Sequence, residues 1–242
     1  MSRPGPMEPM RWIPPETGAL LDVGCNTGDL LADCRRLYPH MRLAGIDVNH
    51  SAIEVARQKV PDAELHQGFG YRLPFADAQF PCVTCIEVIE HVPAQHRALL
   101  MGEVRRVLHA GGRFVLRCPH AGWFDWLDAQ NFRFQFPRLY KTLVGEGNRD
   151  PHYCASGEEI VPHYHFRREE LMALAGSGWE VKACVYGGLV LFPITDILRW
   201  PFYRRNRADH WIARALQKVA AFEMGLNFGR GSYGILLVLR KV

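Results

Sequence analysis

The sequence predicts a single α/β domain built on a Rossmann-like, doubly wound and mostly parallel seven-stranded sheet. Short apolar runs alternate with amphipathic segments between residues 19 and 118, and a glycine-rich turn follows the first run. This alternation is typical of parallel βαβ units with helices on both faces of the sheet. A length of 242 residues suits one such domain and is short for two.

The expected elements follow one another at regular spacing in the first half of the chain. Pro39 and Pro61 mark the ends of the first two helices, because proline disrupts a helix interior. After a long irregular stretch, a helix, a strand and a final antiparallel strand are expected. The expected strands cover 19–25, 42–48, 63–68, 82–89, 113–118, 179–186 and 233–241, and the expected helices cover 29–39, 51–60, 94–108 and 167–178.

Two irregular segments interrupt this pattern. We expect a core of residues 17–118 and 166–242, with a lid insertion over 119–165 and a second cap segment over 187–215. Both segments are rich in aromatic and basic residues and show no clean period, and the irregular stretch that begins with the second one continues to residue 231. A connection of this length inside a compact domain is usually functional, so both segments are expected to fold over a binding site.

Composition excludes several classes of protein. The chain is 48% hydrophobic and 22% charged, which argues against disorder, collagen-like repeats and a multi-spanning membrane protein. A net charge of +4 is too small to indicate an acidic partner. The start, MSRPGPMEPMRWIPPE, lacks the apolar stretch of a signal peptide, so a cytoplasmic location is expected.

Seven cysteines fit reduced thiols better than a disulfide framework, because their number is odd and their positions are scattered. Cys82 and Cys85 form a C-x-x-C. The pair lies inside the apolar run CVTCIEVI and has no second pair to complete a zinc site. We therefore interpret both as strand residues.

The turn after the first strand carries the strongest functional signal. It reads Asp22-Val-Gly24-Cys25-Asn26-Thr-Gly28, and its glycines allow the backbone to turn tightly and approach a ligand. The spacing G-x-N-x-G departs from the G-x-G-x-x-G of dinucleotide-binding folds. Asp47 ends the second strand, where an acid can accept hydrogen bonds from ribose hydroxyls.

These residues resemble those of a known family. LLDVGCNTGDLL is similar to motif I of class I S-adenosylmethionine (SAM)-dependent methyltransferases, with Asn26 in place of the middle glycine. GFGYRLPFADAQF resembles a later family segment, with Phe69 where an aspartate is expected, and the similarity resumes in YHFRREELMALAGSGWEV. The resemblance implies SAM as the cofactor, with adenine held around Phe69 and Gly70. It assigns cofactor binding to Asp22, Gly24, Cys25, Asn26, Gly28, Asp47, Val48, Phe69, Gly70, Ile86 and Glu87.

Methyl transfer from a sulfonium requires an acceptor held in line in a dry pocket. A hydroxyl acceptor must also lose its proton, and histidine is the commonest base near neutral pH. His91 follows the fourth strand at the expected site, and His163 is the second catalytic candidate. The other histidines in or near the insertion are His120, His152 and His165.

The run Glu87-Val-Ile-Glu90-His91 also suggests a metal. It resembles the E-x-x-E-H of ubiquinone-biosynthesis O-methyltransferases and of small-RNA 2′-O-methyltransferases, which bind a divalent ion there. The downstream HYHFRREEL would add His163, with His165 as the less favoured choice. Glu87, Glu90, His91 and His163 are thus candidate ligands for Mg, Mn or Zn. Many superfamily members with E-V-I-E-H-V use no metal, and both readings stay open.

The leading functional prediction is O-methylation of a small-molecule, glycosidic or lipid-linked hydroxyl acceptor. The segments GWFDWLDAQNFRFQFPRLYK and ILRWPFYRRNR could stack a planar acceptor or contact a membrane surface peripherally. We expect most of their aromatic side chains to pack on the domain. An RNA 2′-O-methyltransferase is an alternative, but the small net charge disfavours nucleic acid. A second alternative is a non-catalytic SAM-binding protein.

Overall fold

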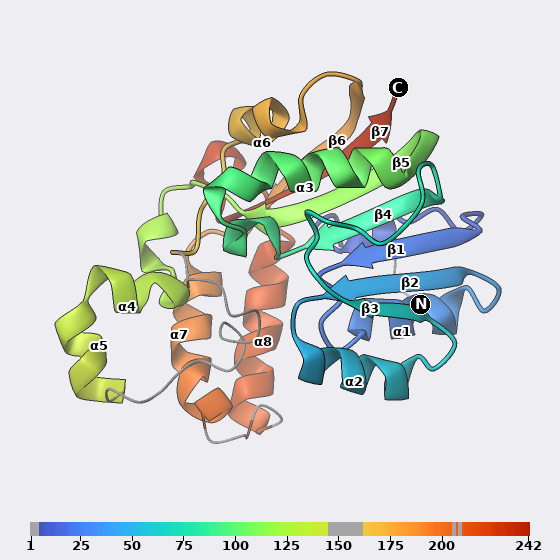
Figure 1. The fold of residues 1–242 in the computed structure, drawn as a ribbon. Helices are drawn as coiled ribbons and strands as arrows, with labels where there is room; N and C mark the ends of the chain where they lie inside the picture. Colours follow the sequence, from blue (N-terminus) through green and yellow to red (C-terminus); the bar gives the residue numbers. More distant parts are fainter. Residues whose placement is uncertain (1–4, 145–161, 205–206, 208–209) are drawn as a thin grey trace.

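The computed structural model describes residues 5–144, 162–204, 207 and 210–242. These residues form a seven-stranded sheet of order β3-β2-β1-β4-β5-β7-β6 (Figure 1). β1 to β5 pair in parallel, whereas β7 is antiparallel to both of its neighbours, which confirms the predicted fold class. The strands are β1 Ala19–Val23, β2 Arg42–Asp47, β3 Glu64–Gln67, β4 Phe80–Ile86, β5 Leu108–Pro119, β6 Trp179–Gly187 and β7 Gly234–Lys241.

Helices cover both faces of this sheet. On one face, Leu100 and Leu171 pack in one buried cluster with residues of β1, β2, β4, β5 and β7, and half-buried residues of β6 pack against this cluster. On the other face, Leu31 and Ile53 pack over β1 and β2, which leaves the parallel strands apolar on both sides. The covering helices are α1 Asp29–Leu37, α2 His50–Lys59, α3 Ala94–Val107 and α6 Arg168–Ala175.

The segment before β1 also belongs to the core. Met7 is buried against Val115 and Leu236, on the part of the sheet that α1 and α2 do not reach. Arg113 donates a hydrogen bond of 2.9 Å to the carbonyl of Trp12 and ties the segment to β5. A single turn, η1 Pro9–Arg11, lies within it. The segment thus covers a face of the sheet.

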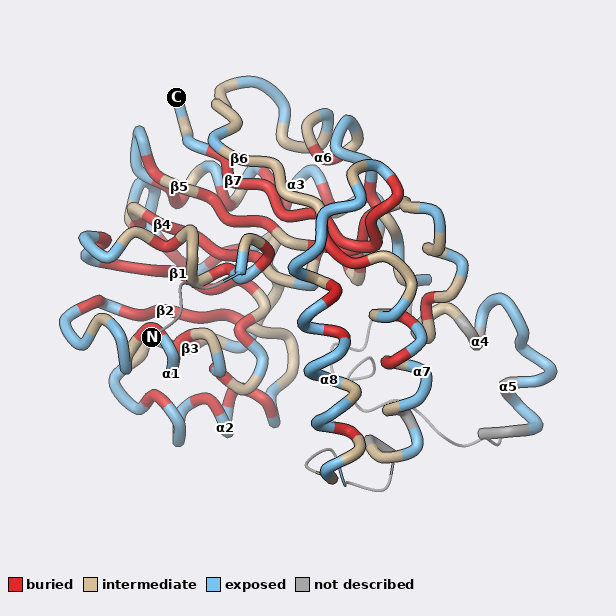
Figure 2. Tube along the Cα trace, turned by 180° about the vertical axis from the view of Figure 1, so that it is seen from behind, coloured by how far each residue is buried: buried red, intermediate tan, exposed pale blue. Residues whose placement is uncertain are grey.

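A helical cap lies to one side of the sheet (Figures 1 and 2). The expectation that 119–165 and 187–215 are irregular was wrong for much of the described part, because both contain helices. Prolines at 193 and 201 and a high aromatic content hide the helical period in the sequence. The cap contains η3 Asp125–Leu127, η4 Ala129–Asn131, α4 Phe132–Gln135, α5 Pro137–Val144, α7 Leu191–Arg204, α8 Trp211–Met224 and η5 Gly229–Gly231.

Glu223 joins two of the cap helices. Its carboxylate, on α8, accepts hydrogen bonds from the backbone N–H groups of Val190, Leu191 and Phe192, at 3.2, 3.0 and 2.8 Å. These donors open α7 and have no partner inside their own helix. A negative charge at a helix N-terminus is also electrostatically favourable. The start of α7 is therefore fixed by a residue about 30 positions later.

β4 and β5 differ in detail from the prediction. The tetrapeptide HAGG was expected to be a turn but lies within β5, and the register with β4 shifts between Phe80 and Cys82. Cys82 and Cys85 are buried in β4, as the sequence predicted. None of the described helices has the length and apolar character needed to cross a bilayer.

Candidate functional site

The glycine loop lies at the carboxyl end of β1, between the loops that follow β2 and β4. Gly24, Asn26 and Gly28 adopt φ angles of 77°, 45° and 75°. The N–H groups of Gly24 and Cys25 donate to the carbonyl of Ile46, at 2.7 and 3.1 Å. A Cβ on Gly24 would lie 2.1 Å from Cγ2 of Val88. Glycine is therefore required there by both conformation and space.

Asp47 links this loop to the loop after β2. Its Oδ2 accepts a 2.8 Å hydrogen bond from the N–H of Asn26, and its Oδ1 accepts one of 2.8 Å from Asn49. Asn49 in turn caps α2 by accepting from the N–H of Ala52. Each carboxylate oxygen retains a lone pair, so the same group can also accept from a diol. The Asp47 position is thus fixed by the backbone before any ligand binds.

Asp22 has a different environment from the one that cofactor binding would need. Its side chain is 3% exposed, and Oδ1 accepts a 2.7 Å hydrogen bond from the hydroxyl of Thr84 on β4. Burial raises the pKa of Asp22 to about 7, and the negative charge of Asp47 adds to the effect. Asp22 therefore joins β1 to β4 beneath the glycine loop.

An aromatic column follows β3, where the resemblance places adenine. Phe69 stacks on Tyr71 with ring centroids 4.9 Å apart, and Tyr71 stacks on His96 at 4.4 Å. A Cβ on Gly70 would lie 2.7 Å from Val23, so the backbone passes close to β1. This column offers aromatic surface in place of the aspartate that family members carry at Phe69.

The remaining residues predicted to bind the cofactor lie at the same edge. Val48 follows β2 and accepts a 3.3 Å hydrogen bond from the side chain of Gln67, and Ile86 ends β4 half-buried. Glu87 has a φ of 55° and an exposed side chain that pairs with Arg117 at 2.8 Å. Partial loss of water raises the pKa of Glu87, but the Arg117 guanidinium outweighs this and holds it below its ordinary value.

Glu90 and His91 follow β4 in the turn η2 Ile89–His91 and meet a residue from the far side of the insertion. Ligand-capable atoms of Glu90, His91 and His163 lie within 4.8 Å of one another, so three of the four predicted metal ligands come together. Glu87 lies outside this group and pairs with Arg117 instead. The η2 turn thus brings the catalytic candidates His91 and His163 together, with ring centroids 4.7 Å apart.

Glu90 is fully buried. Neither of its carboxylate oxygens has a hydrogen-bond partner among the described residues, and Nε2 of His163 lies 3.5 Å from Oε1. Burial raises the pKa of Glu90 to about 8, and the negative charge of Glu87 adds to the shift. An unsatisfied carboxyl in the interior is costly, and this one marks a position where a cation or a donor is favoured.

Asp128 is a functional candidate that sequence reasoning missed. It is 3% exposed, contacts Nδ1 of His163 and lies 2.8 Å from Nε2 of His165. Burial by itself would lower the pKa of His163, but Asp128 and Glu90 outweigh this and raise it to about 10. His163 therefore carries a proton at neutral pH and is a donor there rather than a base. The sequence around Asp128 matches no motif, so nothing in the sequence indicated this residue.

The side chain of His120, another histidine near the insertion, contacts the backbone of a core segment. His120 is 4% exposed, and its Nδ1 lies 2.9 Å from the carbonyl of Ser232, which joins β5 to the segment before β7. Burial lowers the pKa of His120. His152 lies outside the described residues.

The aromatic side chains of the insertion were expected to pack on the domain, and this was wrong for several of them. Trp123 is 71% exposed, Trp126 60% and Phe136 52%. The insertion therefore presents aromatic surface to the exterior.

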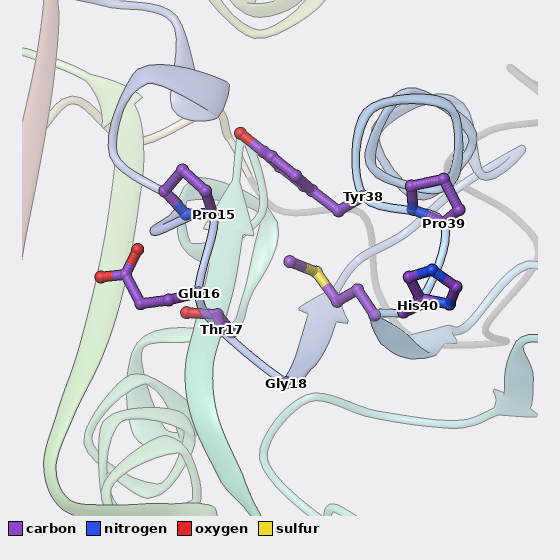
Figure 3. A pocket seen from close by; sticks show the side chains of 8 residues that line it. Pro15, Glu16, Thr17, Gly18, Tyr38, Pro39 and His40 are labelled. Atoms are coloured by element: carbon purple, nitrogen blue, oxygen red, sulfur yellow. The ribbon is translucent and has the colours of Figure 1, made fainter.

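A separate hollow of about 250 Å³ lies at the opposite edge of the sheet (Figure 3). Its lining includes Pro15, Glu16, Tyr38 and His40, from the segments that precede β1 and β2. Sites in open parallel sheets lie beyond the carboxyl ends of the strands, and this hollow lies at the amino ends. It has no part in the site described above.

The strand order, the antiparallel β7 and the glycine loop beside Asp47 define a methyltransferase-type Rossmann-like protein. The comparisons agree with this class. A family model described as "Methyltransferase domain" matches residues 21–116. A SAM-dependent methyltransferase from Methanosarcina mazei shares the fold, with a TM-score of 0.55 at 20% identity, over 96% of each chain.

Relatives at higher identity give the family. A demethylmenaquinone methyltransferase of Deinococcus radiodurans is 32% identical over 69% of this chain and 71% of its own length. An O-methyltransferase of Penicillium expansum is 33% identical over 44% of this chain and 40% of its own. The alignments with the Thermotoga maritima and Chlorobaculum parvum relatives span only 42% and 37% of those proteins. The chain belongs to the class I SAM-dependent methyltransferases.

Proposed function

We propose that this chain transfers the methyl group of SAM to a hydroxyl oxygen of a small-molecule, glycosidic or lipid-linked acceptor. The proposal is based on the residues at the carboxyl ends of the parallel strands. There the glycine loop and Asp47 lie beside η2, which supplies His91. Cofactor and acceptor sites on one edge are what an in-line transfer needs.

The residues at this edge fit the cofactor. The positive φ angles of Gly24 and Gly28 turn the loop tightly, with Gly24 packed against Val88, and Asp47 presents an oriented carboxylate for a diol. The stacked Phe69 and Tyr71 supply aromatic surface for a purine. When bound, SAM supplies an electrophilic methyl group on a sulfonium.

His91 is proposed as the base that takes the proton from the acceptor hydroxyl. It follows the carboxyl end of β4, next to the loop that carries the cofactor contacts. His163 lies beside it and holds a proton at neutral pH, so it suits donation to the acceptor or stabilisation of negative charge. The two histidines therefore have complementary roles in this proposal.

The cap surface supports a lipid-linked acceptor among these classes. α7 and α8 pack on each other, and each exposes apolar side chains at helical spacing. On α8 these are Trp211, Val219 and Phe222, with Arg214 and Lys218 on the same exposed face. Apolar residues flanked by cations are typical of helices that lie at a membrane surface.

Metal-assisted deprotonation is the second candidate, because Glu90, His91 and His163 form a group that fits a divalent ion. In that case a metal such as Mg, Mn or Zn would acidify the acceptor hydroxyl, and His91 would be a ligand. An RNA acceptor finds no support in the charge of the chain, and we retain small molecules as the acceptor class.

The test is a methyl-transfer assay with SAM carrying a labelled methyl group and a panel of hydroxylated aromatic, glycosidic and prenylated acceptors. The labelled methyl group should be bound to an oxygen of the product, as a methyl ether. NMR of the product distinguishes this from a methyl group on carbon or nitrogen. Label on carbon or nitrogen would overturn the oxygen assignment and leave the family intact. Activity that survives exhaustive chelation would exclude the metal-assisted route.

A further inference from the structure

A second group of ligating side chains lies on the cap side of His163. Asp128, His163 and His165 have ligand-capable atoms within 4.8 Å of one another. Their side chains are 2%, 10% and 7% exposed. Asp128 comes from the turn between η3 and η4, whereas the two histidines come from the segment that leads into α6, so the group bridges two separate parts of the chain.

The second nitrogen of each histidine already faces an acceptor. Nδ1 of His165 lies 3.1 Å from the carbonyl oxygen of His120, and a carbonyl can only accept, so this nitrogen carries a hydrogen. Nε2 of His165 is then the nitrogen whose lone pair can bind a metal, and it points at Asp128. Metal-binding histidines characteristically donate their other N–H to a carbonyl or carboxylate.

In His163, the nitrogen that does not face Asp128 points toward a carboxylate, that of Glu90. Its Nε2 faces Oε1 of Glu90 at 3.5 Å, while its Nδ1 contacts Asp128. The amide of Asn131 fixes the backbone of His163 by two hydrogen bonds, of 2.7 and 2.8 Å. With Nε2 turned toward the Glu90 carboxylate, His163 presents Nδ1 to the same point as Asp128 and His165.

We infer that Asp128, His163 and His165 bind a divalent cation of the zinc class, with Nδ1 of His163, Nε2 of His165 and a carboxylate oxygen of Asp128 as ligands. Two imidazoles and one carboxylate form a donor set that suits Zn²⁺ and leaves a fourth position open. Glu90 and the His120 carbonyl orient the two rings from behind, and His91 is not a ligand. The site goes beyond the methyl-transfer proposal and does not depend on it. Binding of the cation would displace the proton from Nδ1 of His163, so the donor role proposed for His163 belongs to the metal-free protein.

The metal would have a structural role. It would tie the insertion, through Asp128, to the segment that carries His163 and His165, and thereby hold η3 and η4 against the core. The buried carboxylate supplies the negative charge that a cation needs, and protein ligands that are already buried and hydrogen-bonded lose little freedom on binding.

The experiment uses the full chain, stripped of metal and then titrated with Zn²⁺ by calorimetry and with Co²⁺ by absorption spectroscopy. One equivalent should bind, with the visible Co²⁺ bands of a four- or five-coordinate site. His165→Ala should weaken Zn²⁺ binding by at least about 100-fold, beyond the 10- to 100-fold typical of a change in the second coordination sphere. His165→Gln is the reserve variant if the alanine variant does not fold.

Two matched variants distinguish this site from one centred on η2. His91→Ala should leave Zn²⁺ affinity within about 3-fold of the wild type, because His91 is not a ligand here. Asp128→Asn should weaken binding as His165→Ala does. If His91→Ala abolishes binding while His165→Ala retains it, or if the wild type binds no Zn²⁺ or Co²⁺, the inference is overturned. S-adenosylhomocysteine binding, measured on the same samples, reports the proposed function separately.

Discussion

The glycine-loop edge and the cap are held together in different ways. At the edge, neighbouring loops are joined by backbone groups and one carboxylate, as when Asp47 accepts from Asn26 and Asn49. In the cap, buried ionisable side chains join segments far apart in sequence, as when Asp128 contacts His165. The structure of the edge therefore depends on backbone shape, whereas the structure of the cap depends on charge and protonation.

The largest expected effect separates chemistry from cofactor binding. His91→Asn should lower turnover by about 10²- to 10⁴-fold, the usual contribution of a general base, while cofactor affinity stays near that of the wild type. Steady-state kinetics and calorimetry on the same preparation measure both quantities. The matched control is His40→Ala, because His40 is exposed at the opposite edge of the sheet. A fully active His91→Asn variant would place the base elsewhere.

The backbone dependence of the edge is tested at Gly24. Gly24→Ala should lower the free energy of unfolding by about 2–5 kcal/mol, because a Cβ would clash with Val88 and an alanine is strained at a φ of 77°. Gly102→Ala on α3 is the control, since nothing lies within 4 Å of its Cβ position. In a helix interior alanine is favoured over glycine, so the control should be neutral or stabilising. Equal effects of the two substitutions would refute the account of the loop.

Asp22 provides a pH test beneath the loop. Its pKa is about 7 in the folded chain against an ordinary value near 3.8, so between these values the folded form holds a proton that the unfolded form has lost. Stability from this group is thus greatest below pH 4 and falls as pH rises to 7, by roughly 2–4 kcal/mol. Asp22→Asn removes this dependence, so urea unfolding should show the variant gaining on the wild type as pH rises.

The control for Asp22 is Asp62→Asn, a carboxylate whose side chain is 59% exposed in its pair with Arg35. An exposed ion pair contributes little to stability, so this substitution should change the free energy of unfolding by less than about 1 kcal/mol. A constant difference between Asp22→Asn and the wild type from pH 4 to 7 would contradict the assignment of a buried, proton-holding carboxyl.

A smaller effect is expected at the ribose position. Asp47→Ala removes a carboxylate that can pair with a diol, and loss of such a hydrogen-bonded charge typically costs about 1–3 kcal/mol. Affinity for S-adenosylhomocysteine should fall accordingly, by roughly 5- to 150-fold. Asp62→Ala is again the control. Unchanged affinity in Asp47→Ala would mean that another residue holds the ribose.

The edge could be predicted from sequence, and the cap could not, for the same physical reason. Apolar alternation and the spacing from Gly24 to Gly28 are local patterns, so the strands and the loop were predicted in the right order, although β5 begins at Leu108 and not at Arg113. Partners such as Asp128 with His165 and Glu223 with the start of α7 are 37 and 31 to 33 residues apart, and no local period connects them. The prolines in α7 also concealed a helix that tertiary contacts stabilise.

For His163, the position could be predicted from the sequence but the pKa could not. The family resemblance predicted that His163 lies at the same site as His91, and in the structure the two rings are neighbours. Its proton depends on Asp128 and Glu90, which approach it from two different segments, so its pKa could not be foreseen from the sequence.

Calorimetric titration of the folded chain with S-adenosylhomocysteine tests whether the glycine-loop edge binds SAM. We expect a single site with an affinity in the micromolar range, weakened by Asp47→Ala and retained by His91→Asn. Absence of binding heat at two temperatures, with protein shown to be folded by circular dichroism, would contradict SAM binding at this edge.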